Sequence, residues 1–193
     1  MRDLFGGQLL PGLAYREEII SPAEESSVIA RVDAADLTPF RFQGWVGKRL
    51  TASFGWRYDF DDASFAPTEP LPAWLLALRD RAATFAGIGS DGLVQALLTR
   101  YDPGAGIGWH RDRSVFGDIV GISLGNPATL RFRRRRPGGF DRFSLAVAQR
   151  SVYHLRGEAR RAWEHSIAPI AVPRWSITFR SLASYHGEAA PSP

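Results

Sequence analysis

The sequence contains no cysteine and only one lysine, Lys48, among its 24 basic residues. Without thiols the chain forms neither a disulfide bond nor a thiolate metal site, so a bound metal has to be held by histidine, aspartate or glutamate. No apolar run approaches the roughly 20 residues that a membrane helix needs, and the first residues lack the apolar core of a secretory signal. We therefore expect a cytoplasmic protein with no membrane segment.

Acidic residues are scarce in one stretch, residues 131–161. This stretch holds ten arginines against Asp141 and Glu158, a local charge of +8, whereas the whole chain carries +4. A basic block of this kind suits a polyanion such as nucleic acid, although a solvated surface, or a genome-wide preference for arginine codons, would also produce it. Of these explanations we favour contact with nucleic acid.

The length and composition are those of a single globular domain. A chain of 193 residues is long enough for a sizeable core but short for two domains, and its hydrophobic content of 45% argues against disorder. We expect one domain over residues 1–193 and a monomer.

The apolar pattern predicts one helix followed by a series of short strands. Pro72 suits a first helical turn, apolar residues recur at helical spacing and Gly87 suits a C-terminal cap, so we expect a helix over 72–86. Beyond residue 92, short runs bounded by turn residues indicate a mainly β (α+β) jelly roll. The expected strands are 93–101, 107–112, 118–124, 128–134, 142–148, 151–156, 163–168 and 174–182.

His110 and Asp112 form a His-x-Asp pair whose side chains would share one face of a strand. This pair alone is weak, because four histidines and twelve aspartates produce one by chance in about one of four such chains. A third ligand has to come from His154, His165 or His186. We assign His154 to the core and predict His165, although an isolated histidine in an apolar strand is more often structural. Two histidines and one carboxylate leave open positions, as in non-haem iron(II) oxygenases.

The segment from Arg174 to Arg180 alternates strictly between polar and apolar residues, so its polar side chains share one face. That face either meets solvent or lines the cavity of the metal. In the second case its two guanidiniums need anionic partners, because burying an unpaired charge is costly. A dicarboxylate such as 2-oxoglutarate supplies them. We predict that Arg174 binds its far carboxylate and that Arg180 lies nearer the chelated end or the substrate.

The spacing of these five residues resembles that of the AlkB family of dealkylating dioxygenases. Further motifs follow the family's order over residues 43–182, and together they are specific although each is short. They are Gly55-Trp56-Arg57-Tyr58, the expected helix, Leu98-Thr99-Arg100-Tyr101-Asp102-Pro103-Gly104, Gly108-Trp109-His110-Arg111-Asp112, Ile119 to Gly125 and Arg174 to Arg180.

The resemblance implies a double-stranded β-helix enzyme that uses Fe(II), 2-oxoglutarate and O2. Residues 1–91 would form a lid and its supporting helix, with 43–65 gripping nucleic acid, and 92–185 would form the jelly-roll catalytic core. The implied reaction is oxidative dealkylation of N-alkylated bases in DNA or RNA, with release of an aldehyde, succinate and CO2.

The resemblance also implies roles for individual residues. Tyr101 would hydrogen-bond the co-substrate, and Thr99 and Ser176 would face it at positions where the family often has asparagine. Trp56 and Tyr58 would contact a base or the backbone, although two aromatic residues packed inward explain them equally well.

Two features bear on the substrate. Arg133, Arg134 and Arg135, on the hairpin expected at Pro137-Gly138-Gly139, would contact phosphates in a sequence-independent way. After Asp112 the chain continues with arginine and serine, without the acidic residue that some DNA-repair members have there. Two other functions therefore stay open: a 2-oxoglutarate dioxygenase that acts on a protein or small molecule, and a nucleic-acid-binding module without activity.

Overall fold

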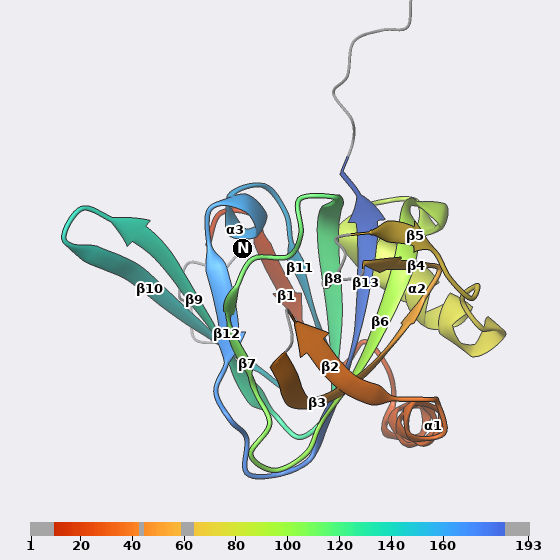
Figure 1. Ribbon diagram of the computed structural model, residues 1–193. Helices are drawn as coiled ribbons and strands as arrows, with labels where there is room; N and C mark the ends of the chain where they lie inside the picture. The colour runs from red at the N-terminus through yellow and green to blue at the C-terminus, as the bar shows by residue number, and fades with distance from the viewer. Residues whose placement is uncertain (1–9, 43–44, 59–63, 184–193) are drawn as a thin grey trace, which may run out of the picture.

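The computed structural model describes residues 10–42, 45–58 and 64–183 (Figure 1). Two antiparallel sheets face each other. The larger sheet consists, in spatial order, of β1 (Leu13–Arg16), β11 (Ser151–Leu155), β8 (Phe116–Gly125), β13 (Arg174–Leu182), β6 (Leu93–Tyr101), β3 (Trp45–Phe54) and β2 (Thr38–Phe42). The smaller sheet consists of β10 (Gly139–Val147), β9 (Ala128–Arg136), β12 (Glu164–Ile167) and β7 (Ile107–His110).

The remaining elements surround these sheets. A two-stranded ribbon pairs β4 (Trp56–Tyr58) with β5 (Phe65–Pro67). The helices are α1 (Pro22–Asp33), α2 (Ala73–Ala86) and the short α3 (Gly157–Arg161), with one turn of 3-10 helix at Ser90–Gly92. None of the described helices is long and apolar enough to cross a membrane.

Helices α1 and α2 cover the outer face of the larger sheet. α1 begins with a capping box, in which the Ser21 hydroxyl accepts from the Glu24 amide and the Glu24 carboxylate accepts from the Ser21 amide. α2 ends at Gly87, whose φ of 69° is the left-handed conformation that glycine adopts without a steric penalty. Both helices bury apolar side chains, among them Val28, Val32, Leu75 and Leu78, in one core with Ile122 and Ile177 of the sheet. This layer closes one side of the larger sheet.

A second core fills part of the space between the sheets. Leu130, Phe132, Leu145 and Val147 of the smaller sheet pack with residues of the larger sheet that include Phe116, Ile119 and Leu155. The inner face of the larger sheet becomes polar on β6 and β13, where Thr99, Ser176 and Thr178 face inward. Polar side chains on an inner face indicate a cavity with a function rather than a continuous core.

The predicted double-stranded β-helix jelly roll is confirmed. The helix expected over 72–86 is α2, and the eight expected strands correspond to β6 to β13 with shifts of a few residues at their ends. The predicted hairpin joins β9 to β10 and turns at Gly138, which has a φ of 78°. In contrast, β1 to β5, α1 and α3 were not predicted.

One expected boundary was wrong, with a consequence for the site. The strand expected over 107–112 ends at His110, so Asp112 lies in the loop that follows and does not share a strand face with His110. Ion pairing to Arg180 on the opposite sheet draws Asp112 away from the strand path. Parts of the expected 1–91 lid region and the 92–185 core, namely 1–9, 43–44, 59–63 and 184–185, lie outside the described residues, as does His186.

Candidate active site

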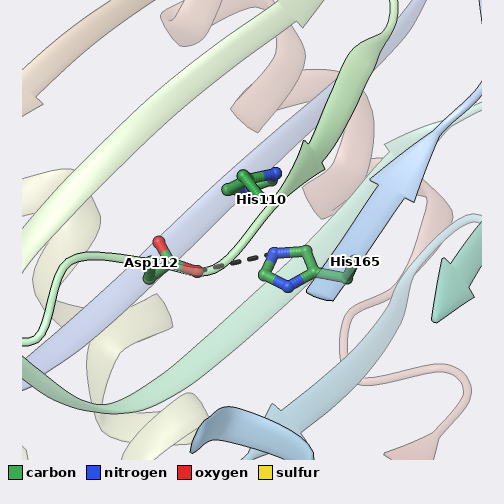
Figure 2. Close-up of side chains that lie close together, drawn as sticks. All are labelled: His110, Asp112 and His165. Atoms are coloured by element: carbon green, nitrogen blue, oxygen red, sulfur yellow. Dashed lines mark ion pairs between the residues drawn. The ribbon is translucent and has the colours of Figure 1, made fainter. Parts of the chain in front are cut away.

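His110, Asp112 and His165 come together between the two sheets (Figure 2). Each offers one ligand atom, and these atoms all lie within 4.8 Å of one another. His165 of β12 stands directly opposite His110 of β7, so strand pairing places the two imidazoles side by side with ring centres 4.3 Å apart. Two imidazoles and one carboxylate on one side of an ion fit Fe(II), because they leave coordination positions free.

Burial keeps the two histidines in the form that binds a metal. Burial lowers the pKa of His110, and burial together with the neighbouring His110 lowers the pKa of His165 to about 3. Burial alone would raise the pKa of Asp112, but the Arg180 guanidinium and the two imidazoles outweigh it and hold that pKa well below its usual value. Two neutral imidazoles and an ionised carboxylate are the protonation states that metal ligation requires.

Hydrogen bonds orient two of the three ligands. His110 Nδ1 lies 2.9 Å from the Gly108 carbonyl oxygen, a contact that favours a proton on Nδ1 and leaves Nε2 free for a metal. Arg180 donates from Nε and Nη2 to Asp112 Oδ1, at 2.9 and 2.6 Å. The other carboxylate oxygen, Oδ2, lies 3.5 Å from His165 Nε2. One oxygen of Asp112 is therefore held by arginine while the second faces the histidines.

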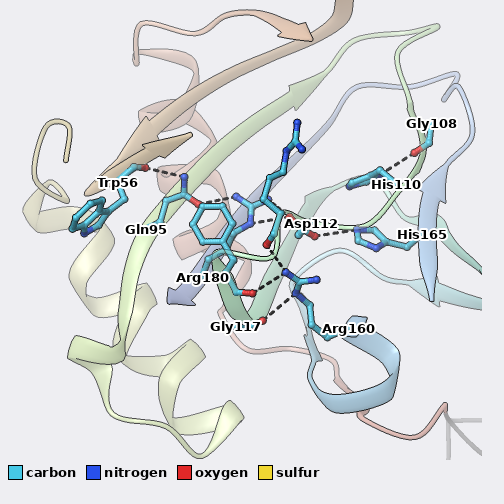
Figure 3. Close-up of polar contacts among 11 residues, drawn as sticks. Trp56, Gln95, Gly108, His110, Asp112, Gly117, Arg160, His165 and Arg180 are labelled. Atoms are coloured by element: carbon cyan, nitrogen blue, oxygen red, sulfur yellow. Dashed lines mark hydrogen bonds and ion pairs between the residues drawn. The ribbon is translucent and has the colours of Figure 1, made fainter. Parts of the chain in front are cut away.

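The arginine that holds Asp112 also connects the site to the β4 strand (Figure 3). Arg180 Nη1 donates to Gln95 Oε1 at 2.9 Å, and Gln95 Nε2 donates to the Trp56 carbonyl oxygen at 2.8 Å. Gln95 is only 3% exposed, and both of its contacts are at least partly buried. A continuous hydrogen-bonded path thus runs from Asp112 to the backbone of β4.

Arg160 of α3 fixes the loop that follows Asp112. It is 7% exposed, and its guanidinium donates to the carbonyl oxygens of Arg113, Phe116 and Gly117 at 2.7 to 3.0 Å. Three charge-assisted hydrogen bonds to one loop stabilise its backbone in the conformation seen here. The position of Asp112 therefore depends on a helix in a distant part of the sequence.

Arg174 has the opposite character, because it is buried and incompletely paired. It is 1% exposed, donates from Nη2 to Ser123 Oγ at 3.1 Å, and has no partner for its Nε and Nη1 groups in the described part of the chain. Its guanidinium carbon lies 5.3 Å from the centre of the Tyr101 ring. Unpaired buried donors on a cation are costly and suit a carboxylate ligand, which accepts two hydrogen bonds from one guanidinium.

A cavity of about 1990 Å³ joins these groups. Besides the three candidate metal ligands, the predicted residues that line it are Tyr58, Thr99, Tyr101, Arg174, Ser176 and Arg180. The Trp56 ring instead stacks on Phe65, with centres 4.8 Å apart, and neither Trp56 nor Arg133, Arg134 or Arg135 belongs to the cavity lining. The three arginines lie on β9, near the hairpin turn.

The sequence did not indicate Gln95, Arg160 or Arg49 as site residues. Arg49 of β3 lines the cavity, with its guanidinium carbon 3.7 Å from the Phe40 ring centre, and burial lowers its pKa. In the described part of the chain Arg49 makes no hydrogen bond or ion pair. A polar residue every second position from Arg49 to Ser53, facing the same way as Thr99, was the available signal.

Comparisons with known proteins agree with this geometry. The family model described as the 2OG-Fe(II) oxygenase superfamily matches residues 23–180. The AlkB dioxygenase of Salmonella typhimurium is 29% identical over 216 residues, which span 95% of this chain and 99% of that protein. The solved structure titled "The structure of OsALKBH1" superimposes with a TM-score of 0.66 at 15% identity, covers 90% of this chain and 98% of its own, and supports the fold.

A second group of relatives is much longer than this chain. The tRNA (carboxymethyluridine(34)-5-O)-methyltransferase ALKBH8 of Mus musculus is 30% identical over 169 residues, which span 83% of this chain but only 25% of that protein. The family match and the arrangement of His110, Asp112 and His165 agree. The chain belongs to the 2OG-Fe(II) oxygenase superfamily, whose members are oxidoreductases that use Fe(II), 2-oxoglutarate and O2, and within it the chain is homologous to the AlkB dioxygenases.

Proposed function

We propose that this dioxygenase removes alkyl groups from the nitrogen atoms of nucleic-acid bases. The observation that carries the proposal is the charge of the cavity. Nine arginines line it against four carboxylates in the described part of the chain. They are Arg41, Arg49, Arg57, Arg111, Arg113, Arg160, Arg161, Arg174 and Arg180, against Asp36, Glu69, Asp112 and Glu164. A cavity with this excess of positive charge favours a polyanionic substrate.

Internal contacts account for only part of this charge. Arg180 and Arg160 are engaged with Asp112 and with backbone carbonyls, and we assign Arg174 to the co-substrate. The other six arginines contribute the rest of the positive charge of the cavity, and Arg57, Arg111 and Arg113 among them also make contacts within the protein. Because one 2-oxoglutarate molecule carries two carboxylates, it does not balance so many cations, whereas a phosphodiester chain does.

The residues of the chain bind and orient the reactants. His110, Asp112 and His165 would hold the iron, and the free donors of Arg174 would bind the far carboxylate of 2-oxoglutarate. Thr99 and Ser176, directly opposite each other on β6 and β13, offer hydroxyl groups along the co-substrate. When bound, iron and 2-oxoglutarate supply an O2-derived oxidant that hydroxylates the carbon on the base nitrogen, with succinate and CO2 as co-products. The hydroxylated group then leaves as an aldehyde.

The substrate would enter along β3 and β4. Tyr58 lines the cavity, and the guanidinium carbon of Arg113 lies 4.8 Å from the centre of its ring. The Tyr58 ring and the Arg113 guanidinium together would contact a base that has left its stack. The stacking of Trp56 on Phe65 supports the same ribbon from outside the cavity. Arg49 is available for the phosphate beside the modified base.

Substituting Gln95 by leucine is expected to raise the KM for an N-methylated oligonucleotide several-fold more than the KM for 2-oxoglutarate. The change removes both hydrogen bonds that join Arg180 to the Trp56 carbonyl. It leaves buried polar groups unpaired, at about 1–3 kcal/mol each, and loosens β4 on the substrate side. Steady-state kinetics in both reactants measure the ratio. Gln149→Leu, the same change at an exposed position, is the control, and equal rises in both KM values would contradict a role for Gln95 in holding β4.

The proposed function is tested by coupled turnover. Purified protein with Fe(II) and ascorbate is assayed for succinate and aldehyde, with N-methylated and unmethylated single-stranded DNA, RNA and tRNA. We expect methylated strands to stimulate succinate formation and to yield one aldehyde per succinate above the unstimulated rate. The RNA arms are included because ALKBH8 relatives are named for tRNA modification. Succinate formation that no nucleic acid stimulates would refute the proposal and favour a protein or small-molecule substrate.

A further inference from the structure

The outer face of the smaller sheet carries four arginines on the two strands of the hairpin. Leu130 and Phe132 point inward to the core, so the alternation of a strand turns Arg131, Arg133 and Arg135 outward. Arg142 of β10 stands directly opposite Arg133 and shares that face. Two like charges directly opposite each other destabilise a strand pair, so this arrangement indicates an anionic ligand rather than a device for stability.

Two acidic residues of the region, Asp141 and Glu158, pair with the arginines of the other face. Arg134 pairs with Glu158 and Asp141, and Arg136 also pairs with Asp141. Among the described residues of the outward face, Glu164 is the one carboxylate beside the four arginines, and it pairs with Arg133 at 2.6 Å. Four arginines and one carboxylate leave a net charge of +3 on that face.

Aromatic rings alternate with these arginines. The guanidinium carbon of Arg133 lies between two rings, 4.6 Å from the centre of Trp109 and 4.8 Å from that of Phe140. Arg131 also lies over Trp109, at 5.2 Å, and Arg142 lies near Phe140, at 5.9 Å. Both rings are partly exposed. We call this set of Trp109, Arg131, Arg133, Arg135, Phe140 and Arg142 the outer track.

The outer track starts at the active-site cavity. Trp109 and Glu164 line the cavity, and Trp109 is the neighbour of His110 in sequence. From β7 the track crosses β12 and β9 to β10, which extends away from the body of the molecule (Figure 1). Three inter-strand spacings of about 4.8 Å give a width of roughly 14 Å, enough for a few nucleotides of an extended strand.

We propose that the outer track binds the single-stranded nucleic acid that flanks the modified nucleotide, with phosphates on its arginines and bases stacked on Trp109 and Phe140. Positively charged side chains interleaved with aromatic platforms are the combination that binds single strands without sequence preference. The inference rests on the proposed function for the identity of the strand, but it concerns a surface outside the cavity. It also divides the arginine run, because Arg134 and Arg136 lie on the opposite face of the hairpin, where they pair with Glu158 and Asp141.

Binding measurements with strands of two lengths test the outer track. Fluorescence anisotropy is measured with labelled thymidine oligonucleotides of four and sixteen nucleotides, and with a sixteen-unit abasic strand. The proteins are the full-length wild type, Phe140→Ala, Arg142→Gln and Arg31→Gln. Arg31 lies exposed on α1, on the other sheet, and controls for the loss of one positive charge. Thermal unfolding of each protein shows whether a variant is folded.

We expect wild type to bind the sixteen-nucleotide strand more tightly than the four-nucleotide strand and than the abasic strand. Phe140→Ala should lose roughly tenfold in affinity for the long strand, because it removes one stacking platform. Arg142→Gln should reduce the slope of log K against log salt concentration by about 0.7, the value for one phosphate of a single strand. Arg31→Gln should bind both strands as wild type does.

Three results would overturn the outer track: equal wild-type affinity for the long and short strands, equal wild-type affinity for the thymidine and abasic strands, or unchanged affinity for the long strand in both Phe140→Ala and Arg142→Gln. These failures are separate from failure of the proposed function. If methylated strands of four and sixteen nucleotides stimulate turnover equally, the proposed function is supported and binding by the outer track is contradicted. If binding depends on strand length but no strand stimulates turnover, the outer track is supported and the proposed function is contradicted.

Discussion

Substitution of His165 by alanine is expected to remove measurable metal binding and to lower 2-oxoglutarate conversion by more than about a hundredfold. Changes to groups that merely support a metal ligand already cost about 10–100-fold, and His165 is one of only three donors in the cluster. Neither neighbour replaces it, because Asp112 is held by Arg180 and His110 is oriented by Gly108. Titration with Mn(II), which avoids oxidation, measures the affinity, and succinate formation measures the rate.

His154 supplies the matched control for this experiment. It is also a buried histidine of the jelly roll, 3% exposed, but its Nε2 contacts Asp118 Oδ1 at 2.7 Å and it lies outside the metal cluster. His154→Asn is expected to keep the wild-type affinity for Mn(II), whatever it does to thermal stability. Unchanged Mn(II) affinity in His165→Ala, or an equal loss in both variants, would contradict the assignment of the metal site.

The C-terminal half of the fold was predictable because its strands carry local signals. β6 and β8 to β13 are apolar or alternating runs between turn residues. The strict alternation in β13 correctly placed Trp175 and Ile177 on one face and Ser176 and Arg180 on the face that lines the cavity. Each of these strands buries at least one face against a core, so its pattern follows from its own sequence. The predicted end of β7 failed because an ion pair with a distant strand, and not local propensity, fixes where Asp112 lies.

The N-terminal half carries local signals as well, but they were not recognised as strands or helices. β3 alternates Arg49, Thr51 and Ser53, which face the polar cavity, with Leu50, Ala52 and Phe54. α1 has few apolar residues and buries mainly Val28 and Val32. Its capping box at Ser21 and Glu24 was nevertheless present in the sequence and was the signal that could have located it.

The candidate site shows the same division between local and distant signals. The ligands His110 and Asp112 are two residues apart, and a motif found them. Arg160 was counted within a basic block, yet it is buried and holds a loop 43 to 47 residues away. The contact of Arg180 with Gln95 joins residues 85 apart and arises only from the register of β13 against β6. Such partners follow from topology, which composition and spacing do not contain.

Replacing Arg174 by methionine is expected to raise the KM for 2-oxoglutarate by about a hundredfold or more. The free Nε and Nη1 donors of Arg174 suit one carboxylate, and two hydrogen bonds to a charged group, at about 1.5 kcal/mol or more each, correspond to that factor. The KM of Arg174→Lys for 2-oxoglutarate should fall between those of wild type and Arg174→Met, because lysine keeps the positive charge but lacks the paired donors of a guanidinium. Arg100→Met, on the outer side of the adjacent strand, is the control.

Thermal unfolding separates this role from a structural one. Without co-substrate, Arg174→Met should be at least as stable as wild type, because it removes a buried cation with two unpaired donors, whereas a structural arginine would destabilise the fold when lost. With 2-oxoglutarate and Mn(II), wild type should gain stability, by about 2.7 kcal/mol at one hundred times its Kd, and the variant should gain far less at the same concentration. If Arg174→Met is less stable than wild type without ligand, yet 2-oxoglutarate and Mn(II) stabilise both proteins equally, Arg174 is a structural residue of the core. The far carboxylate would then be bound by another arginine of the cavity.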